Sequence, residues 1–133
     1  MAELTLDAKV ENLDRVLELV NQVLEDANCS FRAQMQVDVA VEEMYVNIAH
    51  YAYPSGAGQA TVRIEVLPDA VEISLIDSGL PFDPLKKVDP DVTLSAEQRQ
   101  IGGLGIYMAK KNMDEIEYRY QDGKNILVMR KKV

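Results

Sequence analysis

Hydrophobic positions divide the first part of the chain into a strand and two helices. Residues 3–10 alternate apolar and polar side chains, which predicts a half-buried strand. A helix capped by Asn12 should follow and end near Asn28. Its apolar stripe, at helical spacing, consists of Leu13, Val16, Leu17, Val20 and Leu24. This helix is expected to serve core packing alone.

A second helix is predicted from its cap at Ser30 to about Tyr53, ahead of a turn at 54–58. The buried side of this helix is expected to comprise Phe31, Met35, Ala40, Val41, Met44 and Ile48.

Two β-hairpins account for most of the remaining apolar positions. Residues 61–66 and 71–75 alternate around a turn at Pro68-Asp69, and the second strand ends at Asp77. Residues 116–120 and 126–129 alternate around Asp122-Gly123, a strong hairpin signal. A third helix begins at a run of glycines before them. The order predicts an α/β (α+β) two-layer sandwich, with helices on one face of a mixed, mainly antiparallel sheet.

The segment between Asp77 and Gly105 lacks this periodicity. It is rich in Pro, Asp, Lys, Ser and Gln, and a stretch of about two dozen such residues is usually a lid or a disordered segment. We interpret it as a lid over a nucleotide. Arg99 is the cation nearest the glycines and a candidate for phosphate contact, although a plain polar loop would have the same composition.

Composition narrows the classes of function. The 133 residues carry 14 basic and 22 acidic side chains, a net charge of −8, which argues against nucleic-acid binding. No apolar run is long enough to span a bilayer, and the N-terminus does not resemble a signal peptide. Cys29 has no second cysteine to pair with. We expect a single domain over residues 1–133, cytoplasmic and without a membrane partner.

Three polar residues stand out on the second predicted helix. Glu43, Asn47 and His50 are spaced i, i+4, i+7 and therefore share one face. They could face solvent or pair locally, as polar groups on helices usually do. They could instead provide a carboxylate base beside an oxygen ligand for Mg²⁺, for which the amide of Asn47 is suitable. The spacing alone leaves both alternatives open.

Two further segments have nucleotide-binding chemistry. Asp77 ends a strand and can accept a hydrogen bond from an exocyclic amine such as that of adenine, while Gly79 permits close backbone approach. Glycines at a helix start expose backbone N–H groups where the helix dipole also favours an anion. The residues at that helix start are Gly102, Gly103, Leu104 and Gly105. Phe82, between the two segments, is interpreted as a packing anchor rather than a base-stacking platform.

Taken together, these segments resemble a known family. Glu43-Met-Tyr-Val-Asn47, Asp77-Ser-Gly79 and Gly103-Leu-Gly105 are similar, in order, to the N, G1 and G2 boxes of the ATPase superfamily shared by gyrase, histidine kinases and mismatch-repair proteins. Within it, residues 43–53, 77–84 and 102–118 resemble the small bacterial anti-sigma-factor serine kinases. The resemblance covers essentially the whole chain and implies the Bergerat ATP-binding fold.

The resemblance also implies roles for individual residues. Glu43 corresponds to the catalytic carboxylate, Asn47 to the Mg²⁺ ligand, and Asp77, with Gly79 beside it, to the reader of adenine. Gly102, Gly103, Leu104 and Gly105 correspond to the phosphate-binding turn. The implied function is an ATP- and Mg²⁺-dependent serine/threonine kinase that phosphorylates an anti-sigma-factor antagonist and regulates a sigma factor. Dimerisation is common in that family.

Two positions depart from the family pattern. Ile101 stands where some relatives have an arginine before the glycines, and Asn125 stands in a hairpin that often contains Gly-Thr. Asn125 is a candidate for a polar contact with the base. Glu43 favours the kinase, whereas Ile101 favours a non-catalytic switch that binds a partner under ATP/ADP control.

Overall fold

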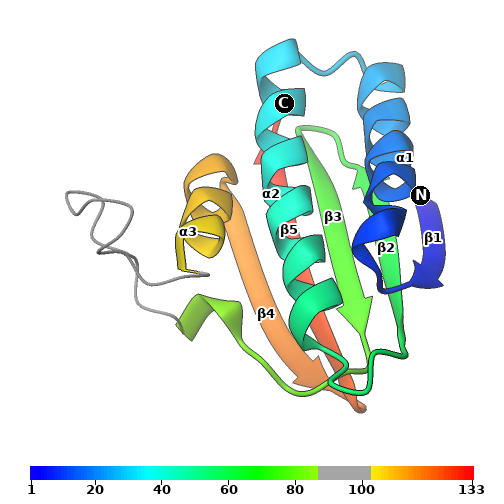
Figure 1. The fold of residues 1–133 in the computed structure, drawn as a ribbon. Coiled ribbons are helices and arrows are strands. Elements are labelled where there is room, and N and C mark those ends of the chain that lie inside the picture. The colour runs from blue at the N-terminus through cyan, green and yellow to red at the C-terminus, as the bar shows by residue number, and fades with distance from the viewer. Residues whose placement is uncertain (87–102) are drawn as a thin grey trace.

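The computed structural model describes residues 1–86 and 103–133, which form two layers (Figure 1). Helices α1 (Leu13–Asp26), α2 (Phe31–Tyr51) and α3 (Gly103–Asn112) cover one face of a five-stranded sheet. The strands are β1 (Ala2–Asp7), β2 (Gln59–Val66), β3 (Ala70–Asp77), β4 (Glu115–Gln121) and β5 (Lys124–Lys132). Short 3-10 turns lie at η1 (Val10–Asn12) and η2 (Pro84–Lys86).

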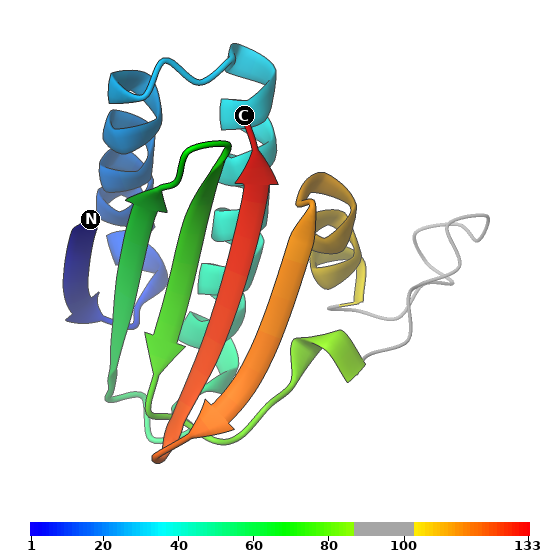
Figure 2. The same ribbon diagram turned by 180° about the vertical axis from the view of Figure 1, so that it is seen from behind.

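The sheet has the order β1-β2-β3-β5-β4. Each pairing between these strands is antiparallel, so the predicted two-layer sandwich is confirmed, with an antiparallel rather than a mixed sheet in the described part. Seen from behind, the described helices leave the second face of the sheet uncovered (Figure 2). The register places Asp77 of β3 directly opposite Asn125 of β5. This pairing brings together residues far apart in the sequence.

The core lies between the sheet and the helices. Alternate residues of the central strands face the apolar stripes of α1 and α2, and each fully buried aliphatic side chain contributes about 1.5–3 kcal/mol. The largest of these buried residues include Val16, Val20, Leu24, Val37, Val41, Met44, Val62, Ile64, Ile73, Leu75 and Met129. Tyr45 is also fully buried, and its hydroxyl donates to the carbonyl of Lys9 at 2.8 Å. The core thus fixes α2, which carries two candidate site residues.

The helix ends follow local sequence signals, with one exception. Asn28 adopts a positive φ of 57°, and the backbone N–H of Cys29 donates to the Leu24 carbonyl, which closes α1 where predicted. Ser30 caps α2 by accepting from Ala33 N at 3.1 Å. Asn12 makes no side-chain cap bond and donates instead to the Asp7 carbonyl at 2.9 Å.

The predicted buried side of α2 is wrong at its N-terminal end. Phe31 and Met35 are 76% and 51% exposed, because they lie on a different stripe of the helix from its buried residues. The buried stripe of α2 comprises Ala33, Val37, Ala40, Val41, Met44 and Tyr45. None of the described helices is long and apolar enough to cross a membrane.

Candidate functional site

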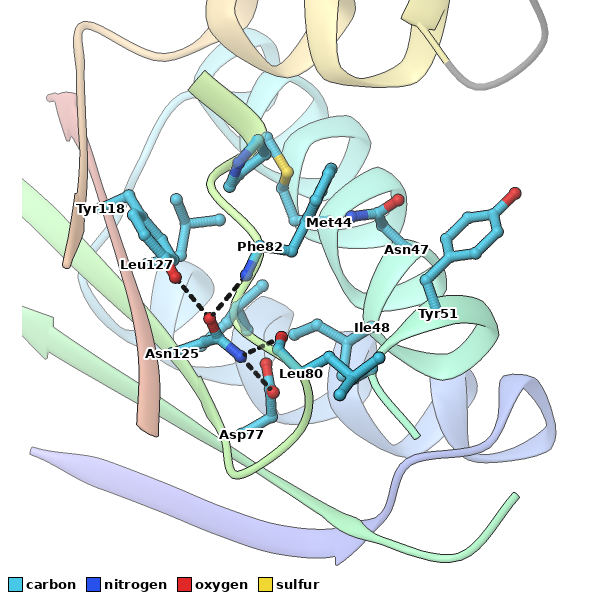
Figure 3. Close-up of a pocket in the computed structure, with 13 residues that line it drawn as sticks. Met44, Asn47, Ile48, Tyr51, Asp77, Leu80, Phe82, Tyr118, Asn125 and Leu127 are labelled. Atoms are coloured by element: carbon cyan, nitrogen blue, oxygen red, sulfur yellow. Dashed lines mark hydrogen bonds between the residues drawn. The ribbon is translucent and has the colours of Figure 1, made fainter. Parts of the chain in front are cut away.

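A hollow lies between the C-terminal half of α2 and the ends of β3, β4 and β5 (Figure 3). It encloses about 440 Å³, counting the space at its open mouth. Its lining is mostly apolar, with a few polar side chains that point inward, which is the usual character of a small-molecule site. The lining residues are Met44, Asn47, Ile48, Tyr51, Ala52, Leu75, Asp77, Leu80, Phe82, Pro84, Tyr118, Asn125 and Leu127.

Asp77 is the buried carboxylate of this hollow, and only 5% of its surface is exposed. The alternation of β3 continues through Ile73 and Leu75, so the Asp77 side chain also points toward the helix layer. Its Oδ1 accepts from the backbone N of Gly79 and from Nδ2 of Asn125, both at 2.9 Å. Its Oδ2 has no hydrogen-bond donor among the described residues. That oxygen is therefore available to accept from a ligand.

Gly79 allows a close backbone approach, as predicted, but the neighbour is the end of α2. A Cβ at Gly79 would lie 2.3 Å from the carbonyl oxygen of Ala52. The next backbone N–H, that of Leu80, donates to the same oxygen at 2.9 Å. Gly79 therefore fixes the segment after β3 against α2 and shapes one wall of the hollow.

Asn125 is the hydrogen-bonding centre of the hollow, a role that sequence reasoning missed. Its Oδ1 accepts from the backbone N of Phe82 at 3.1 Å and from the hydroxyl of Tyr118. Its Nδ2 donates to Asp77 and, at 2.9 Å, to the Leu80 carbonyl. These bonds hold protein groups rather than aim the amide at a base. The feature that identifies this role is the register between β3 and β5, which hydrophobic periodicity does not provide.

Phe82 lies on the wall of the hollow and is 38% exposed. Its backbone is tied to Asn125, while Tyr118 and Leu127 line the same hollow from β4 and β5. Apolar and aromatic groups from the loop and from two strands thus border the space beside Asp77 (Figure 3). The chemistry of this lining is complementary to a flat apolar ring with one donor at its edge.

A second hollow adjoins the first and shares Asn47 and Tyr51 with it. Its lining residues are Glu43, Val46, Asn47, His50, Tyr51, Gly105 and Ile106. The predicted trio of Glu43, Asn47 and His50 does share a face of α2, and this face turns toward α3. A Cβ at Gly105 would lie 2.2 Å from Oε2 of Glu43, so the glycine makes room for the carboxylate.

Glu43 is half-buried and has no hydrogen bond or ion pair with another described residue. Burial raises the pKa of its carboxyl group, and the negative charge of Glu42 raises this pKa further. A carboxylate with a raised pKa and no cationic partner is a better proton acceptor than an ordinary surface glutamate.

Asn47 sits where the two hollows meet, and its amide makes no hydrogen bond within the described residues. The described residues contain no cluster of three or more His, Cys, Asp or Glu side chains that could hold a metal. A single amide oxygen beside a phosphate site nevertheless fits Mg²⁺, which takes few protein oxygens and completes its shell with phosphate and water.

The remaining predicted residues differ in how far they can be placed. Gly103 begins α3, whereas Arg99, Ile101 and Gly102 lie outside the described residues, as does the side chain of Leu104. His50 is exposed and contacts the ring of Tyr51 edge-on, with 5.9 Å between the ring centroids. Tyr53 holds the adjoining backbone, because its hydroxyl accepts from Ser78 N at 2.8 Å and donates to the Gln59 carbonyl.

Comparison with known proteins agrees with this geometry. Residues 6–131 match the family model described as "Histidine kinase-like ATPase domain". The chain is 31% identical over 94 residues to a serine-protein kinase RsbW of Bacillus cereus, covering 68% of this chain and 59% of the relative. It is 28% identical over 130 residues to the serine-protein kinase RsbW of Listeria monocytogenes, covering 94% and 83%.

Solved structures share the fold. The RsbU and RsbW domains of a Mycobacterium tuberculosis protein superpose with a TM-score of 0.68 at 16% identity, covering 98% of this chain and 32% of that one. A chain of the SiaB–SiaC complex of Pseudomonas aeruginosa superposes with a TM-score of 0.62 at 20% identity, covering 98% of this chain and 89% of that one. The catalytic domain of the histidine kinase ThkA gives 0.57 at 12% identity, covering 99% and 97%.

Proposed function

The chain belongs to the histidine kinase-like ATPase family, and from this premise we propose that it is an ATP-dependent serine/threonine kinase acting on a partner protein. One arrangement carries the proposal. Asp77 and Glu43 each present an oxygen without a partner among the described residues, in adjoining hollows, and Asn47 lies at the junction. This order suits a nucleotide with its base at Asp77 and its phosphates near Glu43.

Recognition of adenine is assigned to the first hollow. The free Oδ2 of Asp77 accepts from the 6-amine, and the apolar walls contact the faces of the ring. A guanine at this position would present a carbonyl oxygen to the carboxylate, and the two acceptors would repel. The site is therefore expected to prefer ATP over GTP.

Binding of the phosphates is assigned to the second hollow and the start of α3. Helix α3 begins at Gly103, so its first backbone N–H groups and its dipole favour an anion at that end. The same glycine-rich turn would include Gly102, Leu104 and Gly105. Mg²⁺ held by Asn47 would neutralise phosphate charge when bound. The chain's own contribution is to hold the phosphates near Glu43.

Glu43 is assigned as the base of the transfer. It accepts the proton from a serine or threonine hydroxyl of the partner, whose oxygen forms the new bond to the γ-phosphorus. The bond between that phosphorus and the β–γ bridging oxygen breaks, and ADP leaves with the bond's electrons. Positioning and charge neutralisation contribute most of the rate in such reactions, so the base is one part of the machinery.

The proposed partners rest on the resemblance to the anti-sigma-factor serine kinases, and the relatives support a protein substrate. Two of the similar proteins are serine-protein kinases named RsbW, and one similar structure is a complex of two proteins. We propose a sigma factor as the bound target and an anti-sigma-factor antagonist as the phosphoacceptor. Both would be met in the cytoplasm, and a homodimer is consistent with this class of protein.

A phosphoryl-transfer assay with Mg²⁺ and γ-labelled ATP tests the function, with purified anti-sigma-factor antagonist proteins of the same organism as candidate acceptors. Label is expected on a serine or threonine of the antagonist. Glu43→Gln should lower transfer at least about 100-fold, the usual worth of a general base, while ATP still binds. Glu65→Gln, an exposed residue of β2, is the matched control.

The opposite result identifies the alternative function. If the wild-type chain binds ATP but transfers no label, the kinase is excluded and a nucleotide-gated binding switch becomes the favoured function. In that case its affinity for the sigma factor should differ between ATP and ADP. Equal affinity in both nucleotides would exclude the switch as well.

A further inference from the structure

We propose that Asn125 and Tyr118 are positioning residues that orient the Asp77 carboxylate and so set the selectivity of the site for a purine with a 6-amine. This inference rests on the proposed binding of ATP. Neither residue is needed to contact the nucleotide for this effect. They form a chain of directional hydrogen bonds from β4 through β5 to β3 that ends at the Asp77 carboxylate (Figure 3).

The orientation of the Asn125 amide is forced by its neighbours. The backbone N–H of Phe82 is a donor only, so it requires the amide oxygen. The Asp77 carboxylate and the Leu80 carbonyl are acceptors, so they require the amide nitrogen. A flipped amide would set donor against donor and acceptor against acceptor, which is costly at a residue only 6% exposed.

This orientation decides which oxygen of Asp77 meets the ligand. Both protein donors, Gly79 N and Asn125 Nδ2, converge on Oδ1. Two donors on one oxygen fix the rotation of the carboxylate plane and leave Oδ2 without a donor among the described residues.

Tyr118 supports the amide from the far side. Its hydroxyl donates to Asn125 Oδ1, the same oxygen that accepts from Phe82. Burial raises the pKa of the Tyr118 hydroxyl, which keeps it protonated and able to donate at neutral pH. Since Tyr118 sits on β4 and lines the hollow, it links the position of the amide to the sheet itself.

The test separates recognition of the amine from general packing of the site. Asn125→Asp is nearly isosteric and keeps an acceptor for Phe82 and Tyr118, but it replaces the donor to Asp77 with an oxygen. Tyr118→Phe removes only the hydroxyl. Tyr120→Phe is the matched control, since Tyr120 lies one pleat along β4 and is 47% exposed. Affinity is measured for ATP and for purine riboside triphosphate, which lacks the 6-amine.

Wild type and Tyr120→Phe are expected to bind ATP at least about tenfold more tightly than the purine analogue, the value of one hydrogen bond to a carboxylate. Asn125→Asp should reduce this ratio of affinities to near one, chiefly by weakening the binding of ATP. Tyr118→Phe should reduce it about threefold, with affinity for the analogue unchanged. Far-UV circular dichroism confirms folding, and Tyr118→Phe alone decides the question if Asn125→Asp does not fold.

Two results would overturn the inference in different ways. In the first, the wild type prefers ATP while the variants lose affinity for ATP and for the analogue equally. In that case Asn125 and Tyr118 only pack the hollow, and the proposed ATP site stands. If the wild type itself binds both triphosphates equally or neither, the assignment of Asp77 fails, and the proposed function is contradicted with it.

Discussion

At the residue scale, the two site carboxylates occupy opposite environments. Asp77 is buried but accepts two hydrogen bonds on one oxygen, which hold the carboxylate in place. Glu43 has no hydrogen bond or ion pair among the described residues, and burial raises its pKa. The first environment suits a fixed acceptor that reads a base. The second suits a group that takes up a proton.

Replacement of Asp77 by asparagine tests the reading of the base. The substitution keeps the size of the side chain. It can also keep an oxygen that accepts from Gly79 and Asn125, so the fold should be unchanged. It would then present an NH₂ group where Oδ2 stood, facing the donor amine of adenine. We expect ATP affinity to fall at least about tenfold by isothermal titration calorimetry, with an unchanged circular dichroism spectrum. Unaltered ATP affinity would mean that the base binds elsewhere.

The pH dependence of transfer tests the role of Glu43. Glu43 must be ionised to accept a proton, and its raised pKa places the acid limb of the rate profile above the range of an ordinary glutamate. Glu42→Gln removes a neighbouring negative charge that raises this pKa. The limb should therefore move to lower pH.

The measurement is single-turnover transfer across the pH range, at fixed ionic strength. Glu65→Gln removes the same charge at a distant exposed site and should leave the limb in place. A limb that moves to higher pH in Glu42→Gln, or that moves equally in both variants, would remove Glu43 as the titrating base.

At the element scale, two glycines allow α2 to lie close to its neighbours, and each glycine has a different role. Gly79 lies against the backbone of Ala52, which cannot yield without moving the end of α2. Gly105 lies against the carboxylate tip of Glu43, which is the far end of a flexible side chain. A methyl group at the first position therefore disturbs the fold, whereas at the second it displaces a single functional group.

Gly105→Ala separates stability from catalysis on this basis. The change is inside α3, where alanine is the better helix former by about 0.8–1 kcal/mol, so thermal stability should not fall. The added Cβ would push Glu43 from its position, and phosphoryl transfer should drop at least about tenfold. Gly79→Ala is the contrasting variant and should lose stability first. Full transfer by Gly105→Ala would show that the position of Glu43 is not critical.

The elements themselves were largely predictable, since each depends on local pattern. Alternation gave both hairpins, and Asp122-Gly123 adopts the positive φ values of 54° and 77° that its turn requires. The exposure of Phe31 and Met35 was not predictable, because α2 is apolar on more than one side. Which stripe is buried depends on how the helix rotates against the sheet, and that is set by tertiary packing.

The site was predictable only in part, for a related reason. Glu43 and Asn47 share a helix face by spacing alone, and Asp77 ends a strand. Asn125 could not be found in this way, because its role depends on the strand register that sets it opposite Asp77. Long-range pairing, rather than composition, determines which polar groups meet in the hollow.

At the scale of the whole molecule, the proposed nucleotide would join the ends of two strands to the start of a helix. The base would contact the ends of β3 and β5, and the phosphates would contact the start of α3. A ligand that binds only when these parts are assembled stabilises the folded state by mass action, by about 2.7 kcal/mol at 100 times its dissociation constant.

Thermal unfolding with Mg-ATP, Mg-ADP and Mg-GTP therefore reports on the whole site. The two adenine nucleotides should raise the unfolding temperature by several degrees, since about 1 kcal/mol moves a domain of this size by a few degrees. Mg-GTP should produce a much smaller rise, because its base offers an acceptor to Asp77. In Asp77→Asn the rise with Mg-ATP should largely disappear, while the ligand-free melting temperature stays close to that of the wild type. Equal stabilisation by ATP and GTP would show that the phosphates alone are bound, and no stabilisation by either would remove the nucleotide from the site.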